Sequence, residues 1–218
     1  HVEEVMRDWR ALGVDGFFAA RHRWLDYHER AVPALAALAG AAPSEVTAMN
    51  TLSVNLHPPL ASFYRPAGTR TALLIERPAF PYDRYAAQSQ VRFHGLDPAR
   101  DLVEVAPRDG EQLLRTEDLV ATIEREGHRI ATILLPGVQY LTGQRLDLRA
   151  ITAAGRRAGC MVGWDLAHAI GNVPLALHDD GVDFAVWCHY KYLNGGPGAA
   201  GGAFVHERHA RRRDLPRL

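Results

Sequence analysis

The segment CMVGWD, from Cys160 to Asp165, is a short apolar run that ends in a carboxylate. A helical-period segment at 148–158 precedes it, and a second apolar run at 184–187 follows it. Apolar runs that alternate with helical segments of about ten residues indicate βαβ units and a mainly parallel sheet covered on both faces. The segment therefore predicts an α/β fold.

The same alternation extends outward along the chain. The other expected strands are Val46 to Met49, Ala72 to Ile75, Leu102 to Val105, Ile130 to Leu135 and Ala203 to Val205. The other expected helices are Val2 to Leu12, Asp26 to Leu38, Val54 to Phe63, Tyr82 to Phe93 and Glu117 to Glu126. We expect an N-terminal helical segment (1–43), one α/β domain (44–209) and the start of a further region (210–218). Because the chain begins with His1, we expect a piece of a longer protein.

Composition excludes several classes of function. Lys+Arg and Asp+Glu both number 25, so no basic field would attract nucleic acid. We expect the arginine-rich stretch 208–217 to be a solvated helix surface. No apolar stretch approaches the ~18 residues of a membrane span. Cys160 and Cys188 lie in apolar runs, which favours buried thiols of a cytoplasmic protein over disulfides.

In parallel sheets, ligands bind beyond the carboxyl ends of the strands. The residues that follow the apolar runs are Asn50 to Ser53, Glu76, Pro136-Gly137, Asp165, and Cys188 to Lys191. Lys191 is the only lysine in the chain, and every other residue of the Lys+Arg count is arginine. Arginine replaces a surface lysine, but it does not serve as an amine nucleophile. A Schiff-base lysine therefore explains Lys191, with a chance surface lysine as the alternative.

Asp165 needs a cationic partner at the edge of an apolar strand. A protonated pyridine ring supplies one, with an attraction of roughly 4 kcal/mol at 4 Å. The alternative is a cap for a following helix, on which His168 would share a face with Asp165. Residues 51–53 precede a helix expected near Val54, so their N–H groups form a natural anion site, although many N-caps share this pattern.

Other ligand classes lack their motifs. The glycine-rich stretch 195–202 has no following Lys-Ser/Thr, and no GxGxxG occurs, so nucleotide binding is disfavoured. The segment His206 to His209 is not HExxH and has no further ligands beside it in the sequence, so we expect no metal site.

Four segments resemble kynureninase, a fold-type I enzyme that depends on pyridoxal phosphate (PLP). They are MNTLSVNLH (49–57), RPAFPYDRYAAQSQ (77–90), WDLAHAIGNVPLALHDDGVDFAVWCHYKYLNGGPG (164–198) and GGAFVHERH (201–209). The resemblance covers about 44–209 and implies the large PLP-binding domain of the aspartate aminotransferase-like class. It implies hydrolysis of L-kynurenine, or its 3-hydroxy form, to anthranilate (3-hydroxyanthranilate) and L-alanine. The implied pathway is tryptophan catabolism toward NAD biosynthesis, and the implied assembly is a homodimer.

The resemblance also assigns roles to residues. It implies cofactor contacts at Leu52, Ser53, Phe80, Pro81, Tyr82, Asp83, Asp165, His168, Tyr190 and Lys191. Lys191 would bond to the cofactor and move protons, and Asp165 would pair with the ring nitrogen. Phe80 would stack on the ring. Tyr190 would bind phosphate together with residues 52–53, and it is the first candidate for a general base.

Two departures from the family pattern matter. Pro136 stands where many members carry a hydroxyl residue, so one cofactor hydrogen bond is expected to be lost or replaced. We also expect the family's N-terminal arm and C-terminal domain to be missing, and with that domain an arginine for the substrate carboxylate. Two alternatives remain open. The first is another fold-type I enzyme, an aminotransferase or a cysteine desulfurase, although Cys160 and Cys188 fall in expected strands rather than on a mobile loop. The second is a non-catalytic remnant.

Overall fold

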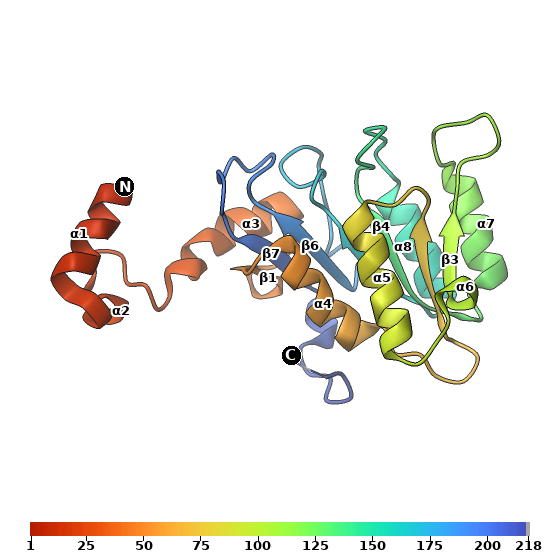
Figure 1. Ribbon diagram of the computed structural model, residues 1–218, viewed down its shortest axis with the longest axis horizontal. Coiled ribbons are helices and arrows are strands. Elements are labelled where there is room, and N and C mark those ends of the chain that lie inside the picture. Colours follow the sequence, from red (N-terminus) through yellow and green to blue (C-terminus); the bar gives the residue numbers. More distant parts are fainter. Residues whose placement is uncertain (217–218) are drawn as a thin grey trace.

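A computed structural model describes residues 1–216. Its central feature is one seven-stranded sheet in the order β1-β7-β6-β5-β4-β2-β3 (Figure 1). The strands are β1 (Val46–Met49), β2 (Ala72–Glu76), β3 (Leu102–Val105), β4 (Ile130–Pro136), β5 (Met161–Asp165), β6 (Phe184–Cys188) and β7 (Gly201–Val205). Each contains an expected strand, except that Cys160 directly precedes β5 and does not lie in it.

Strand direction confirms a mainly parallel sheet. Strands β2 to β6 pair in parallel, whereas β7 runs antiparallel to both of its neighbours, β1 and β6. Strand β1 therefore points the same way as β6. The carboxyl ends of β1, β4, β5 and β6 consequently lie at one edge of the sheet, where a ligand site is expected.

Helices cover both faces of the sheet, as the alternating pattern predicts. The helices α4 (Leu52–Phe63) and α5 (Pro81–Phe93) pack on one face, against Leu73, Phe184 and Val186. The helices α3 (Val32–Ala39), α7 (Thr116–Glu126) and α8 (Leu148–Arg157) pack on the other face. Along β6, Phe184 and Val186 belong to the first cluster while Ala185 and Trp187 belong to the second, so successive residues enter opposite cores. The short helix α6 (Pro98–Asp101) leads directly into β3.

The N-terminal part of the chain divides into two helices that stand apart from the sheet and a third that packs on it. Helix α1 (Val2–Leu12), turn η1 (Gly13–Asp15) and helix α2 (Gly16–Ala19) stand apart from the sheet (Figure 1). The stretch expected to be one helix at 26–38 is a 3₁₀ segment, η2 (Tyr27–Ala31), followed by α3. Pro33 has no N–H to donate, so an α-helix is favoured to begin beside it rather than run through it. Helix α3 packs on the sheet, since Leu35, Ala36 and Ala39 are buried in the core.

The C-terminal part differs from the solvated helix that we expected at 208–217. It contains one 3₁₀ turn, η4 (Glu207–His209), and residues 210–216 form turns and bends. Arg208 donates to the carbonyl oxygen of Gly181 at 2.8 Å and contacts Asp183, so it ties this turn to the sheet. Arg217 and Leu218 lie outside the described residues. Across residues 1–216, no helix has both the length and the apolar character to cross a bilayer.

Candidate active site

Three strand ends meet at the carboxyl edge of the sheet. Asp165 is the last residue of β5, and its register partner at the end of β4 is Pro136. The N–H of Gly137 donates to the carbonyl oxygen of Asp165 at 2.8 Å, which holds these two strand ends together. Strand β6 ends beside them at Cys188, and the chain then bends through Tyr190 and Lys191. The sheet thus brings the lysine and the aspartate of the sequence prediction to one edge.

Asp165 forms a buried pair with Asp83 from helix α5. The side chains of the two residues hydrogen-bond to each other, and both residues are less than a tenth exposed. Burial, and then the charge of Asp165, raise the pKa of Asp83 well above its usual range. Burial also raises the pKa of Asp165, but the hydrogen bond from Asp83 opposes this rise. Within the pair, the hydrogen bond thus favours the protonated form of Asp83 and the ionised form of Asp165.

Asp165 also resembles the helix cap that we kept as an alternative. Its Oδ1 accepts the N–H of Ala167 at 2.7 Å, but residues 167–171 form a turn and not a helix. His168 lies on this turn, half-buried, and Asn172 donates to its carbonyl oxygen at 2.9 Å. Burial, and then the charge of Lys191, lower the pKa of the His168 imidazole. The cap contact uses one oxygen of Asp165 and leaves the carboxylate able to serve a ligand.

Glu76, at the end of β2, adds a third buried carboxyl. It is 3% exposed, and its Oε1 has no hydrogen-bond partner among residues 1–216. Burial, together with the charge of Asp165, raises the pKa of Glu76 to about 8. Oδ1 of Asp83 is likewise buried without a partner within the described chain. An edge with three carboxyls and two unpaired acceptor oxygens suits a ligand that brings positive charge or N–H groups.

Lys191 faces aromatic side chains. Its Nζ lies 5.9 Å from the centroid of the Phe80 ring and 5.9 Å from that of Tyr190. Phe80 packs edge-on against Tyr140 at 5.3 Å and remains 38% exposed, so part of its ring is available to a ligand. Burial and the neighbouring Cys188 thiol raise the pKa of Tyr190. Tyr190 therefore keeps its proton at neutral pH, which suits a hydrogen-bond donor better than a general base.

Two helix N-termini converge on the same edge. Helix α4 begins at Leu52, two residues before the expected start, and Oγ1 of its cap Thr51 accepts the N–H of Val54 at 3.3 Å. Helix α5 begins at Pro81, in the first-turn position expected for a proline. The hydroxyl of Tyr82 donates to the carbonyl oxygen of Ser53 at 3.1 Å and so links the two helices. The first-turn N–H groups of a helix form an anion site, as predicted for residues 51–53.

Gly201 on β7 allows helix α4 to approach the sheet this closely. Its N–H donates to the carbonyl oxygen of Asn50 at 2.7 Å. A Cβ at Gly201 would lie 3.0 Å from the backbone nitrogen of Leu52 and 2.7 Å from the carbonyl oxygen of Trp187. Any side chain here would push the start of α4 away from the edge.

Two features of this site were missed by sequence reasoning. Glu76 was noted by its position after β2, but nothing in the sequence placed it near Asp165. The hydrogen bond between Asp83 and Asp165 was also missed, because it depends on a contact between α5 and β5. The signal available in the sequence was that Glu76 ends an apolar run and Asp83 lies near the start of a helical segment. The fold brings both carboxyls close to Asp165.

Comparisons with known proteins agree with this geometry. No protein-family model matches the chain. A kynureninase from Myxococcus xanthus is 58% identical over 218 residues, which is the whole of this chain but 51% of the relative. A kynureninase from Salinispora tropica is 59% identical over 96% of this chain and 49% of the relative. One from Xanthomonas campestris is 56% identical over 217 residues, again 51% of the relative. The chain spans about half the length of the curated relatives it matches.

Solved structures show the fold. A cysteine desulfurase from Thermococcus onnurineus superposes with a TM-score of 0.72 at 16% identity, over 95% of this chain and 51% of that one. A C-DES K223A mutant with glycine covalently linked to the PLP cofactor superposes with a TM-score of 0.75 at 19% identity. It covers 96% of this chain and 54% of that one. The predicted fold-type I architecture is thereby confirmed, and this chain is, over its whole length, a homologue of about half of a kynureninase polypeptide.

Proposed function

We propose that the chain is the PLP-binding part of an enzyme that hydrolyses L-kynurenine, or 3-hydroxy-L-kynurenine, to L-alanine and anthranilate or 3-hydroxyanthranilate. The observation that carries the proposal is the position of Lys191, the chain's only lysine, at the edge that also holds Asp165, Phe80 and two helix N-termini. The identity of 58% to a kynureninase along the whole chain supports the same activity. We further propose a place for this activity in tryptophan catabolism toward NAD biosynthesis.

The residues at the edge fit PLP chemically. The ring nitrogen of PLP is basic, and the Asp83–Asp165 pair, with one unpaired acceptor oxygen on Asp83, would hold it protonated. The phosphate would bind at Leu52 and Ser53 in the first turn of α4, with the hydroxyl of Tyr190 as a further donor. Phe80 would lie against the ring, with Pro81 and Tyr82 placing it at the start of α5. When bound, PLP supplies an electron-withdrawing ring that weakens bonds to the substrate's α-carbon.

The chain's own residues would then act on the substrate in defined ways. Lys191 would bond to PLP through Nζ, and afterwards carry a proton at that atom. Asp165 would keep its negative charge against the ring nitrogen, because the hydrogen bond from Asp83 favours the ionised form of Asp165. His168, on the turn after β5, would orient Asp165 from the solvent side. Pro136 has neither a hydroxyl nor an N–H, so it donates no hydrogen bond to a ligand.

An absorbance experiment tests the proposal. Purified protein would be titrated with PLP and then with L-kynurenine, and spectra would be compared with those of a Lys191→Arg variant. We expect a lysine-dependent visible band that shifts when L-kynurenine is added. A band that ignores L-kynurenine but responds to L-cysteine would instead support a desulfurase. The position of Cys188 does not favour that alternative. A desulfurase needs a reactive cysteine on a mobile loop, whereas Cys188 is 1% exposed at the end of β6.

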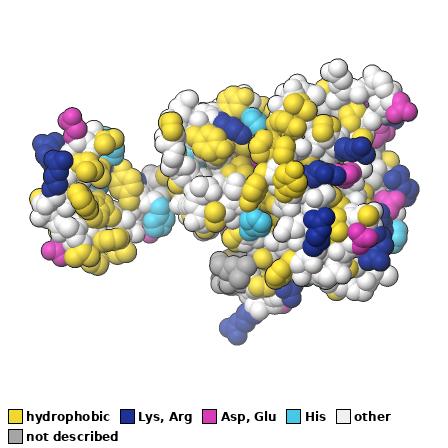
Figure 2. Space-filling view, in the orientation of Figure 1, with side chains coloured by type: hydrophobic (Ala, Val, Ile, Leu, Met, Phe, Trp, Pro, Cys, Tyr) yellow, Lys and Arg dark blue, Asp and Glu magenta, His cyan; other side chains and the backbone are white. Residues whose placement is uncertain are grey.

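The proposal extends to a cytoplasmic homodimer. Two buried free thiols, Cys160 and Cys188, are typical of a reducing compartment. The N-terminal helices α1 and α2 expose large apolar side chains, including Val2, Trp9 and Phe18. Figure 2 shows hydrophobic side chains gathered on the part of the molecule that stands apart from the body. Apolar side chains of this kind suit burial against a second copy. Light scattering of the intact chain and of a Trp9→Glu, Phe18→Glu variant would measure the loss of dimer that we expect.

A further inference from the structure

Three polar side chains meet at the opposite edge of the sheet from the candidate active site. Glu45 precedes β1, His178 lies on the turn before β6, and His206 directly follows β7. Because β1 and β6 begin at this edge and β7 ends there, the fold brings together segments that are far apart in the sequence. The five residues of β6 place about 16 Å between this edge and the Lys191 edge.

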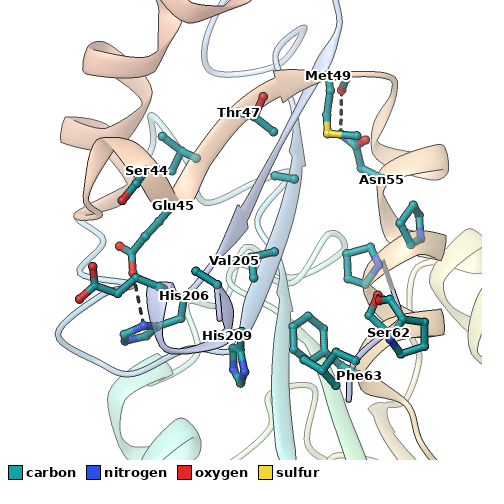
Figure 3. Close-up of a pocket in the computed structure, with 18 residues that line it drawn as sticks. Ser44, Glu45, Thr47, Met49, Asn55, Ser62, Phe63, Val205, His206 and His209 are labelled. Carbon is teal, nitrogen blue, oxygen red and sulfur yellow. Dashed lines mark hydrogen bonds and ion pairs between the residues drawn. The ribbon is translucent and has the colours of Figure 1, made fainter. Parts of the chain in front are cut away.

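The contacts within this group are short and centre on one carboxylate. Nδ1 of His178 lies 3.0 Å from both oxygens of Glu45. Nδ1 of His206 lies 3.3 Å from Oε1 of Glu45, a contact drawn as a dashed line in Figure 3. The two imidazole rings stack, with centroids 4.8 Å apart. One ligand atom from each of the three residues lies within 4.8 Å of the others.

The carboxylate is held in place from behind. The N–H groups of Ala42 and Glu207 donate to its two oxygens, each at 2.8 Å, and the Glu45 side chain is fully buried. These backbone donors favour the ionised form, and together with His178 they lower the pKa of Glu45 against the effect of burial. Oε1 of Glu45 already accepts a hydrogen bond from the N–H of Glu207. The two imidazoles therefore compete for the remaining lone pairs of the carboxylate.

A simple ion pair does not explain the contacts of His206 with Glu45. The N–H of Arg208 points to Nδ1 of His206 at 3.3 Å, which requires a lone pair on that nitrogen. An unprotonated Nδ1 and an ionised Oε1, 3.3 Å apart, are two acceptors with no proton between them. A cation between them would bond to both atoms, and its bond to Nδ1 would replace the long 3.3 Å contact from the N–H of Arg208, because this nitrogen has one lone pair.

We propose that Glu45, His178 and His206 bind one borderline divalent transition-metal ion of the Zn²⁺ class, with water as the fourth ligand. Two imidazoles and a carboxylate form a common Zn²⁺ donor set. Metal–ligand bonds of about 2.0–2.1 Å in a tetrahedron separate neighbouring ligand atoms by about 3.3 Å. The separations of 3.0 and 3.3 Å between Glu45 and the two imidazole nitrogens are close to that edge length, and all three ligand atoms lie within 4.8 Å of one another. His178 has a side chain 37% exposed, which leaves room for the ion and its water to enter.

The ion would have a structural role. It would join the turn before β1, the turn before β6 and the segment after β7, which are the segments that flank the antiparallel β1–β7–β6 edge. Glu45 and His206 also border a cavity of about 490 Å³ that extends to Phe63 (Figure 3). The sequence hid this group because its members lie 133 and 28 residues apart, and His206 was judged only by its neighbours in the chain.

Metal binding to the intact chain, with and without PLP, tests the proposal. Dialysed protein would be titrated with Zn²⁺ by calorimetry, and bound zinc would be counted by mass spectrometry. We expect one Zn²⁺ per chain in both states and a zinc-dependent rise in Tm. Mg²⁺ in excess should not compete, because it disfavours nitrogen ligands.

Variants decide whether these residues are the ligands. His178→Ala and Glu45→Gln should each weaken Zn²⁺ binding at least about 100-fold, whereas His128→Ala, at an exposed histidine elsewhere, should leave it unchanged. Unchanged zinc affinity in His178→Ala, or no zinc bound to the wild-type chain, would overturn the proposal. If Glu45→Gln does not fold, His178→Ala decides alone, since its side chain is partly exposed.

Discussion

Replacing Glu76 by glutamine should stabilise the cofactor-free protein, and increasingly so as the pH rises. In the folded protein the pKa of Glu76 is about 8 against its usual 4.5, so the folded state binds the proton more tightly than the unfolded state does. The stability present below pH 4.5 is therefore lost as the pH rises toward 8. At 1.36 kcal/mol per pH unit, the loss is about 1 kcal/mol at pH 5 and about 4 kcal/mol at pH 8. Glutamine has the same shape and no charge, so its variant avoids this loss.

Urea denaturation at several pH values measures the effect. The free energy of unfolding of Glu76→Gln should rise relative to wild type by about 3 kcal/mol between pH 5 and pH 8. Glu117→Gln, on the exposed face of α7, is the matched control and should follow wild type at every pH. Parallel pH profiles for Glu76→Gln and wild type would show that Glu76 ionises freely in the fold, and the account of a crowded acidic edge would fail.

Three further substitutions test other parts of the account. Asp165→Asn should lower kynurenine turnover about a thousandfold while PLP still binds, because it removes roughly 4 kcal/mol of attraction; activity within a few-fold of wild type would leave Asp165 as a turn cap. Gly201→Ala should lower the free energy of unfolding by about 1–3 kcal/mol and weaken PLP binding, since the new Cβ would meet backbone atoms at 2.7 and 3.0 Å. Unchanged PLP affinity would show that the start of α4 does not bind the phosphate. Arg70→Ala should lower the free energy of unfolding, measured by urea denaturation, by about 3 kcal/mol, because Arg70 donates to the carbonyl oxygens of Gly127, Ile130 and Ala158. A loss below about 1 kcal/mol would show that these hydrogen bonds contribute little to stability.

Most of the architecture is predictable from hydrophobic pattern. Strand positions agree with the structure because buried strands leave short apolar runs between helical segments. The antiparallel direction of β7 was not predictable, since an apolar run carries no sign of the direction in which its strand pairs. The start of α4 at Leu52 rather than Val54 follows from the cap at Thr51, which was visible in the sequence but was read as part of a turn.

The site was predictable only in part. Lys191 and Asp165 follow from their positions after strands, because parallel strands bring such residues to one edge. Their environment depends on contacts between segments that the sequence does not order in space. The hydrogen bond between Asp83 and Asp165 joins α5 to β5, and the nearness of Phe80 to Lys191 joins the start of α5 to the bend after β6.

Borohydride reduction tests directly whether Lys191 bonds covalently to PLP. Reduction converts a lysine–PLP bond into a stable amine, which peptide mass mapping then locates. Because this chain contains no other lysine, the amine that competes with Lys191 is the terminal α-amino group of the purified polypeptide. The account predicts one adduct, on the peptide that contains Lys191, and none in Lys191→Arg. An adduct on the N-terminal peptide alone, or no adduct in protein saturated with PLP, would contradict it.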